Sequence, residues 1–280
     1  MTGPPGAPGD SPPDAVIRVR GLVKRFGRHT VHDGVDLDVM RGEVIGIVGG
    51  SGTGKSVLLR QIVGLTKPDG GTIEVLGQSV RDTSETDYRR LRRRWGVMFQ
   101  DGALFSSLTV RQNVEAPMRE QTDLPAALRE TLAGLKVRMV GLPEDAQHKY
   151  PAELSGGMRK RAGFARAIAL DPEIVFLDEP TAGLDPIGAA AFDTLIRQLQ
   201  AALGLTVFLV THDLDSLYAI CDRVAVLADG RMLAVGTIAE LQDVDHPWVR
   251  DYFHGPRARA AATAATGPAA GRPVTPGKES

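Results

Sequence analysis

The sequence predicts an α/β fold built on a parallel sheet, with an antiparallel sheet beside it. Three stretches are almost continuously apolar, as is typical of strands buried on both faces of a parallel sheet: 44–48, 174–177 and 206–210. Helical segments separate them, and such alternation is typical of an α/β fold. By contrast, 16–22 and 35–39 alternate apolar and polar residues, which indicates antiparallel strands with one exposed face.

The remaining elements follow in order along the chain. The segment at 72–77 is predicted to be a further strand of the antiparallel sheet. Helices are expected near 55–64, 86–94, 125–140, 156–170 and 188–203. No strand pattern occurs between 101 and 170, so this region is predicted to be a mostly helical insertion.

Both ends of the chain are predicted to be disordered. Residues 1–15 contain five Pro and three Gly, and residues 255–280 are rich in Ala, Pro and Gly. Such segments cannot bury enough apolar surface to offset their chain entropy. We therefore expect one folded domain over 16–240, followed by a short helix at 241–254.

Composition narrows the functional classes. The 280 residues contain 33 Lys and Arg against 34 Asp and Glu, so no global basic field points to a nucleic-acid partner. A single cysteine, Cys221, excludes an internal disulfide. His29 and His32 have ligand-like spacing but no third ligand nearby, so both are interpreted as surface-loop residues. No apolar run approaches the roughly 18 residues that span a bilayer, and no signal peptide is visible, so we expect a cytosolic protein.

The strongest motif is GGSGTGKS at 49–56, which fits the phosphate-loop pattern G-x-x-x-x-G-K-[ST]. It follows a buried strand and begins a helix, so backbone N–H groups and the helix N-terminus can face one anion. We expect Lys55 to reach the β- and γ-phosphates and the Ser56 hydroxyl to bind Mg²⁺. The nucleotide-binding residues expected in this segment are Gly49, Gly50, Ser51, Gly52, Thr53, Gly54, Lys55, Ser56 and Val57.

A pair of carboxylates follows the strand at 174–177. Asp178 is placed to hold Mg²⁺ through its water shell, as in phosphate-loop NTPases. Glu179 is placed to orient and deprotonate the attacking water. An Asp-Glu pair can also be a solvated strand end, but the phosphate loop in the same chain favours the catalytic interpretation.

A second glycine turn identifies the family. LSGGM at 154–158 precedes a helix and is again an anion-binding turn. One ATP cannot use two turns so far apart unless another subunit brings the second. With its motifs in this order, the sequence resembles the ATP-binding cassette (ABC) family, whose signature is LSGGQ. The resemblance covers about 16–240 and implies a RecA-like parallel-sheet core, an antiparallel β subdomain and a helical signature subdomain at about 101–170.

The resemblance also assigns roles to single residues. Phe26 matches the aromatic residue that stacks on adenine, and Gln100 matches the glutamine that senses Mg²⁺ and the membrane partner. His212 matches the switch histidine that contacts the γ-phosphate, and Asp185 lies in the loop that crosses the dimer interface. The expected γ-phosphate contacts from the second subunit are Ser155, Gly156 and Gly157.

The resemblance therefore implies a homodimeric ATPase that uses ATP and Mg²⁺. Its catalytic residues would be Glu179, His212 and Gln100, and its metal ligands Ser56, Gln100 and Asp178. The sequence departs from the usual family motifs at Met158 (usually Gln), Val57 (often Thr) and Phe26 (commonly Tyr). None of these departures removes a group that the proposed chemistry requires.

Within the family, the motif flanks resemble the Mla/Mce branch, which moves phospholipid between the inner and outer membranes. The segments that carry this likeness are GGSGTGKSVLLRQIVGL, FQDGALFSSLTVRQNV, LSGGMRKRAGFARAIAL and HPWVRDYFHG. The resemblance implies a peripheral subunit on the cytoplasmic face of the inner membrane, bound to an integral membrane permease near 101–118. Leu104 and Phe105 would line the permease groove, or alternatively pack under the helical subdomain.

Three alternative functions stay open at this point. The first is the ATPase of an amino-acid or methionine importer, which uses the same cassette with different groove residues. The second is a soluble ABC ATPase that acts on ribosomes or DNA, although the single cassette and the absence of a long insertion disfavour it. The third is an unrelated phosphate-loop enzyme such as a kinase, for which LSGGM would be a coincidence.

Overall fold

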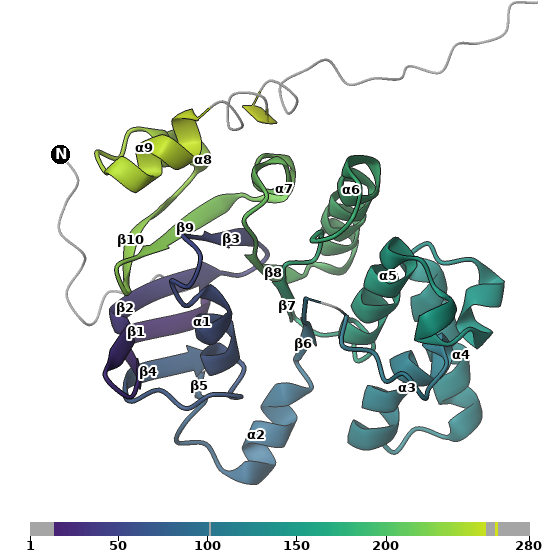
Figure 1. Cartoon of the computed structure of the whole chain (residues 1–280). Helices are drawn as coiled ribbons and strands as arrows, with labels where there is room; N and C mark the ends of the chain where they lie inside the picture. The colour runs from purple at the N-terminus through teal and green to yellow at the C-terminus, as the bar shows by residue number, and fades with distance from the viewer. Residues whose placement is uncertain (1–13, 101, 256–260, 263–280) are drawn as a thin grey trace, which may run out of the picture.

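The computed structural model describes residues 14–100, 102–255 and 261–262 (Figure 1). The predicted disordered ends fall almost entirely outside these residues, so their disorder stays a prediction, as do the domain boundaries. The prediction is wrong at Ala15, which is buried and begins a strand, and at Ala261, which is buried in a helical turn. Within the described residues, no helix combines the length and the apolar character that crossing a membrane requires.

The core of the molecule is a six-stranded sheet with the order β10-β9-β3-β8-β7-β6. All neighbours in it are parallel except β9 and β10. The strands are β3 (Val44–Val48), β6 (Trp95–Met98), β7 (Ile174–Asp178), β8 (Thr206–Val210), β9 (Arg223–Ala228) and β10 (Arg231–Gly236). Every residue of β3, β7 and β8 is buried, which explains their continuous apolar sequences.

A second, antiparallel sheet has the order β2-β1-β4-β5. Its strands are β1 (Ala15–Phe26), β2 (His29–Met40), β4 (Gly70–Val75) and β5 (Gln78–Ser79). The predicted two-sheet α/β architecture is therefore confirmed. The β1–β2 hairpin continues beyond the predicted strands to the Phe26–His29 pair. The sequence did not predict this outer part because it is polar and carries no alternating pattern.

One expectation from the sequence is wrong in this sheet. His32 is not a surface-loop residue: it is completely buried in β2. Its ring nitrogens lie 2.8 Å from Oε1 of Gln61 and 3.2 Å from the carbonyl oxygen of Gly54. Burial lowers the pKa of His32, so its neutral form is favoured. His32 therefore packs beneath the predicted phosphate loop.

Some helices pack on the sheets, and others form a separate helical group. Together they are α1 (Lys55–Ile62), α2 (Glu85–Arg92), α3 (Val110–Gln121), α4 (Ala126–Met139), α5 (Gly156–Ala167), α6 (Pro186–Leu203), α7 (Leu214–Ile220), α8 (Ile238–Gln242) and α9 (Pro247–His254), with short 3-10 turns at Glu144–His148 and Pro151–Glu153. In Figure 1, α3, α4 and α5 lie together beside the edge of the core sheet. The described residues from 102 to 170 contain no strand, as predicted.

Two apolar clusters fix the positions of these parts. One cluster joins α1 to both sheets, with Leu58 and Ile62 packed among residues such as Ile17 and Ile47. The other joins the parallel sheet to the helical group through residues such as Phe164. Consequently α1 is held between two sheets, and its N-terminus is fixed at one edge of the core.

Candidate active site

Three loops meet at one edge of the core sheet. Strand β8 lies between β3 and β7, and all three are parallel. The segments that follow their carboxyl ends therefore emerge side by side, which is where open α/β sheets bind ligands. These segments are the phosphate loop at 49–56, the Asp178-Glu179 pair and the loop that contains His212.

The phosphate loop depends on glycine at its last turn. Gly54 has φ 97° and precedes α1 as its N-cap. A Cβ atom at Gly54 would collide with Val31 and would lie 2.7 Å from Nε2 of His32. Both the backbone conformation and the available space therefore require glycine here.

The Lys55 ammonium lies over this loop. Its Nζ atom donates to the carbonyl oxygens of Gly49 and Gly50, at 2.9 Å each. Burial lowers the pKa of Lys55, while the neighbouring charges of Glu179 and Asp178 oppose that shift. The chain thus holds a partly desolvated cation next to the backbone N–H groups at the start of α1, where phosphate oxygens bind well.

Asp178 and Ser56 form the second part of the site. The Ser56 hydroxyl donates to Oδ1 of Asp178 at 3.0 Å. Asp178 is buried, and burial raises the pKa of its carboxyl group; the Ser56 hydrogen bond opposes this shift and the neighbouring Glu179 adds to it. A hydroxyl beside a buried carboxylate is a set of hard oxygen ligands of the kind that Mg²⁺ prefers.

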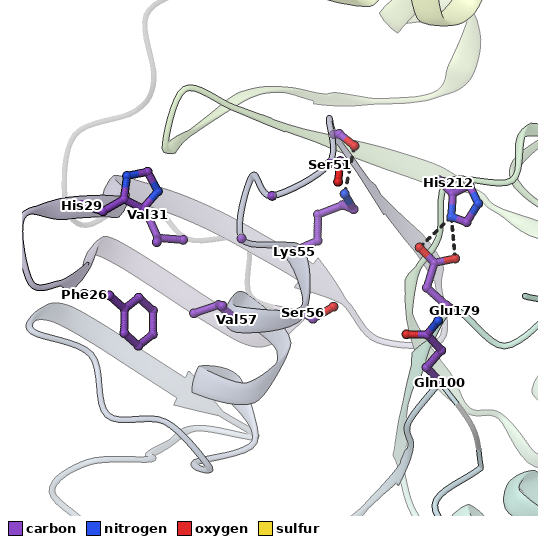
Figure 2. A pocket seen from close by; sticks show the side chains of 13 residues that line it. Phe26, His29, Val31, Ser51, Lys55, Ser56, Val57, Gln100, Glu179 and His212 are labelled. Atoms are coloured by element: carbon purple, nitrogen blue, oxygen red, sulfur yellow. Dashed lines mark hydrogen bonds and ion pairs between the residues drawn. The ribbon is translucent and has the colours of Figure 1, made fainter.

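Glu179 and His212 are hydrogen-bonded above Gln100 (Figure 2). Nδ1 of His212 lies 2.9 Å from Oε1 and 2.8 Å from Oε2 of Glu179, so an Nδ1–H donates to the carboxylate. The Glu179 side chain is 15% exposed and that of His212 is 71% exposed. A carboxylate shielded by the fold therefore orients an imidazole that solvent can reach.

A cleft of about 720 Å³ joins these groups. Eleven of the predicted site residues line it: Phe26, Gly49, Ser51, Gly52, Gly54, Lys55, Ser56, Val57, Gln100, Glu179 and His212. Gly50 and Thr53 belong to the same loop, where the Thr53 hydroxyl donates to the Gly50 carbonyl at 3.0 Å. Phe26 is 52% exposed at one side of the cleft, and the Lys24 ammonium lies 5.1 Å from its ring centre.

Sequence reasoning missed two residues of this cleft, His29 and Val31. Both lie in β2, and His29 pairs with Phe26 across the hairpin. The available signal was the short FGRH turn, which places the two rings opposite each other once it closes. The sequence pattern instead predicts a surface loop at His29.

Seven predicted residues are not among those that line this cleft. Gly50, Thr53 and Asp178 adjoin lining residues in the sequence, whereas Ser155, Gly156, Gly157 and Asp185 belong to the turns before α5 and α6. The Ser155 hydroxyl accepts from the Met158 N–H at 3.2 Å and caps α5. Asp185 caps α6 in the same way, accepting from Gly188 at 2.9 Å. A Cβ atom at Gly156 would lie 3.8 Å from Leu184, so the signature turn and the Asp185 loop are neighbours. Within one chain, the structure does not bring these residues to the phosphate loop.

The sequence matches a known family over the phosphate loop, the signature turn and the Asp178-Glu179 pair. The family described as "ABC transporter" matches residues 32–182. The chain belongs to the ABC transporter family. It is 41% identical over 240 residues to the intermembrane phospholipid transport system ATP-binding protein MlaF of Escherichia coli strain K12, an alignment that covers 86% of this chain and 89% of that protein.

A second relative and a solved structure agree with this assignment. The chain is 39% identical over 241 residues to the probable ribonucleotide transport ATP-binding protein mkl of Mycobacterium tuberculosis strain H37Rv, covering 86% of this chain and 67% of that one. A solved dimeric ATP-binding cassette, in a post-hydrolysis state with ADP and Pi, is 29% identical with a TM-score of 0.73, covering 79% of this chain and 98% of that one. The predicted family and fold are thus confirmed, and the chain is an ATP-binding ATPase of this family.

Proposed function

We propose that this chain is the ATP-hydrolysing subunit of a membrane transporter that moves phospholipid between two membranes. The observation that carries the ATPase part is the Glu179–His212 pair, which lies at the same sheet edge as Lys55 and the phosphate loop. Lys55 and the N–H groups at the start of α1 bind phosphate oxygens. Phe26 provides the aromatic face on which adenine stacks.

Mg²⁺ fits the oxygen ligands of this site. Ser56, Asp178 and Gln100 are the residues that would hold it, and the buried carboxyl of Asp178 is the group whose charge a cation stabilises. When bound, the ion neutralises charge on the phosphates. Glu179 accepts the proton of the attacking water, and His212, held by that carboxylate, contacts the γ-phosphate that the water attacks.

The active unit in this proposal is a homodimer. Ser155, Gly156 and Gly157 form an anion-binding turn that lies outside the cleft of their own chain. A second copy that contributes this turn completes each site, and Asp185 then crosses the interface. The matched cassette is a dimer, which supports this arrangement.

The proposed permease contact is Phe105. This side chain is 56% exposed, whereas Leu104 packs against the core of the helical group. The backbone of Phe105 is fixed by the buried Asn113, whose amide accepts from its N–H at 2.7 Å and donates to its carbonyl at 3.1 Å. The Arg166 guanidinium lies 5.8 Å from the ring centre. An exposed aromatic ring on a fixed backbone suits a hydrophobic partner, which in this proposal is the permease. Binding to the permease would place the chain at the cytoplasmic face of the inner membrane as a peripheral subunit.

Phospholipid is the cargo that the relatives favour. The MlaF relative aligns over nearly its whole length, whereas the alignment with the mkl relative leaves about a third of that protein unmatched. The ribonucleotide cargo in that second name is the competing candidate, ahead of an amino acid. A nucleic-acid partner is not proposed, since the net charge is −1.

The test is purification of the chain with its membrane partner. We expect an Mla/Mce-type permease in the complex, co-purified phospholipid detected by mass spectrometry, and loss of detergent resistance in cells that lack the chain. An amino-acid permease without phospholipid, or ribonucleotide uptake that depends on the chain, contradicts the lipid assignment. ATP turnover is measured on the same sample, so the ATPase and cargo parts are tested separately.

A further inference from the structure

A buried lysine lies behind the catalytic loop. Lys160 is on α5, and only 7% of its surface is exposed. Burying an ammonium group costs free energy unless its N–H groups are hydrogen-bonded. The hydrogen-bond acceptors of the Lys160 ammonium therefore indicate which part of the structure it stabilises.

Two partners of Lys160 come from separate loops of the site. Its Nζ atom donates to the carbonyl oxygen of Gln100 and, at 3.1 Å, to the carbonyl oxygen of Glu179. Gln100 follows β6 and Glu179 follows β7, and these two strands are parallel neighbours. One ammonium group thus joins the backbones of the two loops that flank the catalytic carboxylate.

Glu179 needs this support because its backbone is strained. Its φ is 50°, a left-handed conformation that non-glycine residues rarely adopt. Its N–H donates to the Val210 carbonyl at 2.8 Å, and its own carbonyl accepts from the Ala182 N–H at 3.3 Å. Lys160 adds a charged donor on that same carbonyl, and a charge-assisted bond is stronger than a neutral one.

Lys160 also lies on the helix that begins at the signature turn. Ser155 caps α5, and Lys160 comes just over one turn later in the same helix. We propose that Lys160 is a positioning residue, which holds Glu179 in its catalytic conformation and ties the Gln100 and Glu179 loops to the signature helix. This inference deepens the proposed function and rests on it, because it assumes that Glu179 acts on the attacking water.

The decisive variant is Lys160→Met, which keeps the length of the side chain and removes its N–H groups. We expect kcat for ATP hydrolysis to fall at least about tenfold, while nucleotide affinity stays within about twofold. In the nucleotide-free protein, amide hydrogen exchange over 179–184 is expected to become faster. Lys160→Gln retains an N–H donor and should be intermediate in both measurements, and it serves if Lys160→Met does not fold.

Lys136 provides a matched control. It is also a buried lysine of the helical group, 4% exposed, but its ammonium pairs with Asp171 away from the catalytic loops. Lys136→Met is expected to lower the melting temperature and leave kcat and the exchange over 179–184 unchanged. If Lys160→Met behaves like this control, with unchanged kcat, Lys160 is only structural and the inference is wrong.

The exchange experiment keeps this inference separate from the proposed function. If the wild-type protein does not hydrolyse ATP, the proposed function fails, whereas faster exchange over 179–184 in Lys160→Met still supports the positioning contact. In a mixed dimer with one functional site, Lys160→Met should lower turnover when the subunit that supplies Glu179 carries it. A loss only when the subunit that supplies Ser155 carries it overturns the assignment to Glu179.

Discussion

The chain contains two glycine-rich turns that each begin a helix, and the structure treats them differently. The turn before α1 lies in a cleft with Lys55, Ser56 and Glu179 around it. The turn before α5 is capped by its own Ser155 and lies outside that cleft. The turn before α1 is thus part of a nearly complete nucleotide site, whereas the turn before α5 forms only a fragment of one. What differs is the set of side chains that the fold brings to each turn.

Lys55→Ala should cause the largest loss of ATP turnover at the site that contains the first turn. Removal of the ammonium that lies over the loop takes away the charge that stabilises phosphate oxygens in the transition state. We expect ATP turnover to fall about a thousandfold or more, as measured by phosphate release. Lys67→Ala, a change at an exposed lysine beyond the end of α1, is the control and should leave turnover unchanged. Retained turnover in Lys55→Ala would remove the phosphate loop from the mechanism.

Glu179→Gln separates binding from hydrolysis at the same turn. The amide keeps the shape of the side chain but accepts no proton, so turnover should fall at least about a hundredfold while ATP still binds. Size-exclusion chromatography with ATP is expected to show a stable dimer, because the closed state no longer decays by hydrolysis. A Glu179→Gln protein that hydrolyses ATP at the wild-type rate contradicts the general-base assignment.

Mixing subunits tests whether the second turn completes the first. Lys55→Ala and Ser155→Arg should each be inactive alone, since every site contains one defect. In an equal mixture about half of the dimers carry both variants, and each of these retains one intact site of two, so about a quarter of the wild-type activity should return. No recovery above the separate variants argues against sites shared between subunits.

Phe105→Glu tests the surface that neither turn uses. A charge on this exposed ring position should weaken association with the permease and reduce transport, while ATP binding by the isolated subunit stays unchanged. Leu128→Glu, at a position that is 43% exposed on α4, is the control. Co-purification with the permease measures the effect. Equal loss in both variants would mean that Phe105 has no special role.

The smallest effect concerns the stability of the contact between α6 and α7. Asp193 lies on α6, and burial raises the pKa of its carboxyl to about 7, while a hydrogen bond from Ser216 opposes that shift. The folded state therefore binds a proton that the unfolded state releases above its ordinary pKa of 3.8. Stability from this group is full below pH 3.8 and falls as the pH rises toward 7.

Asp193→Asn should remove this pH dependence, because the amide is neutral at every pH. At pH 8 the variant is expected to be more stable by at most about 4 kcal/mol, with little difference at pH 4. Thermal unfolding at both pH values measures the effect. An equal shift at both pH values would assign the change to packing and not to titration.

Several strands could be predicted from apolar periodicity along the sequence. The same kind of periodicity is present in helix α3. The three buried strands were predicted where they occur, and the inner parts of β1 and β2 were predicted as half-exposed strands, since burial on one or both faces leaves its own periodicity. α3 was predicted only as part of a mostly helical region and not as a separate helix, although Val110, Val114 and Met118 recur at every fourth residue and are all buried. Its interior Pro117 and its polar residues concealed the pattern.

The sequence by itself determined the phosphate loop, the Asp178-Glu179 pair and the family, because a short loop and the residues next to it specify their own local geometry. Only the tertiary structure decided that His32 lies buried beneath Gly54 and that Lys160 bonds to the Gln100 and Glu179 loops. It also separated the signature turn from the cleft. These contacts join residues from different elements, so they follow from how the sheets and helices pack, which no periodicity along the chain records.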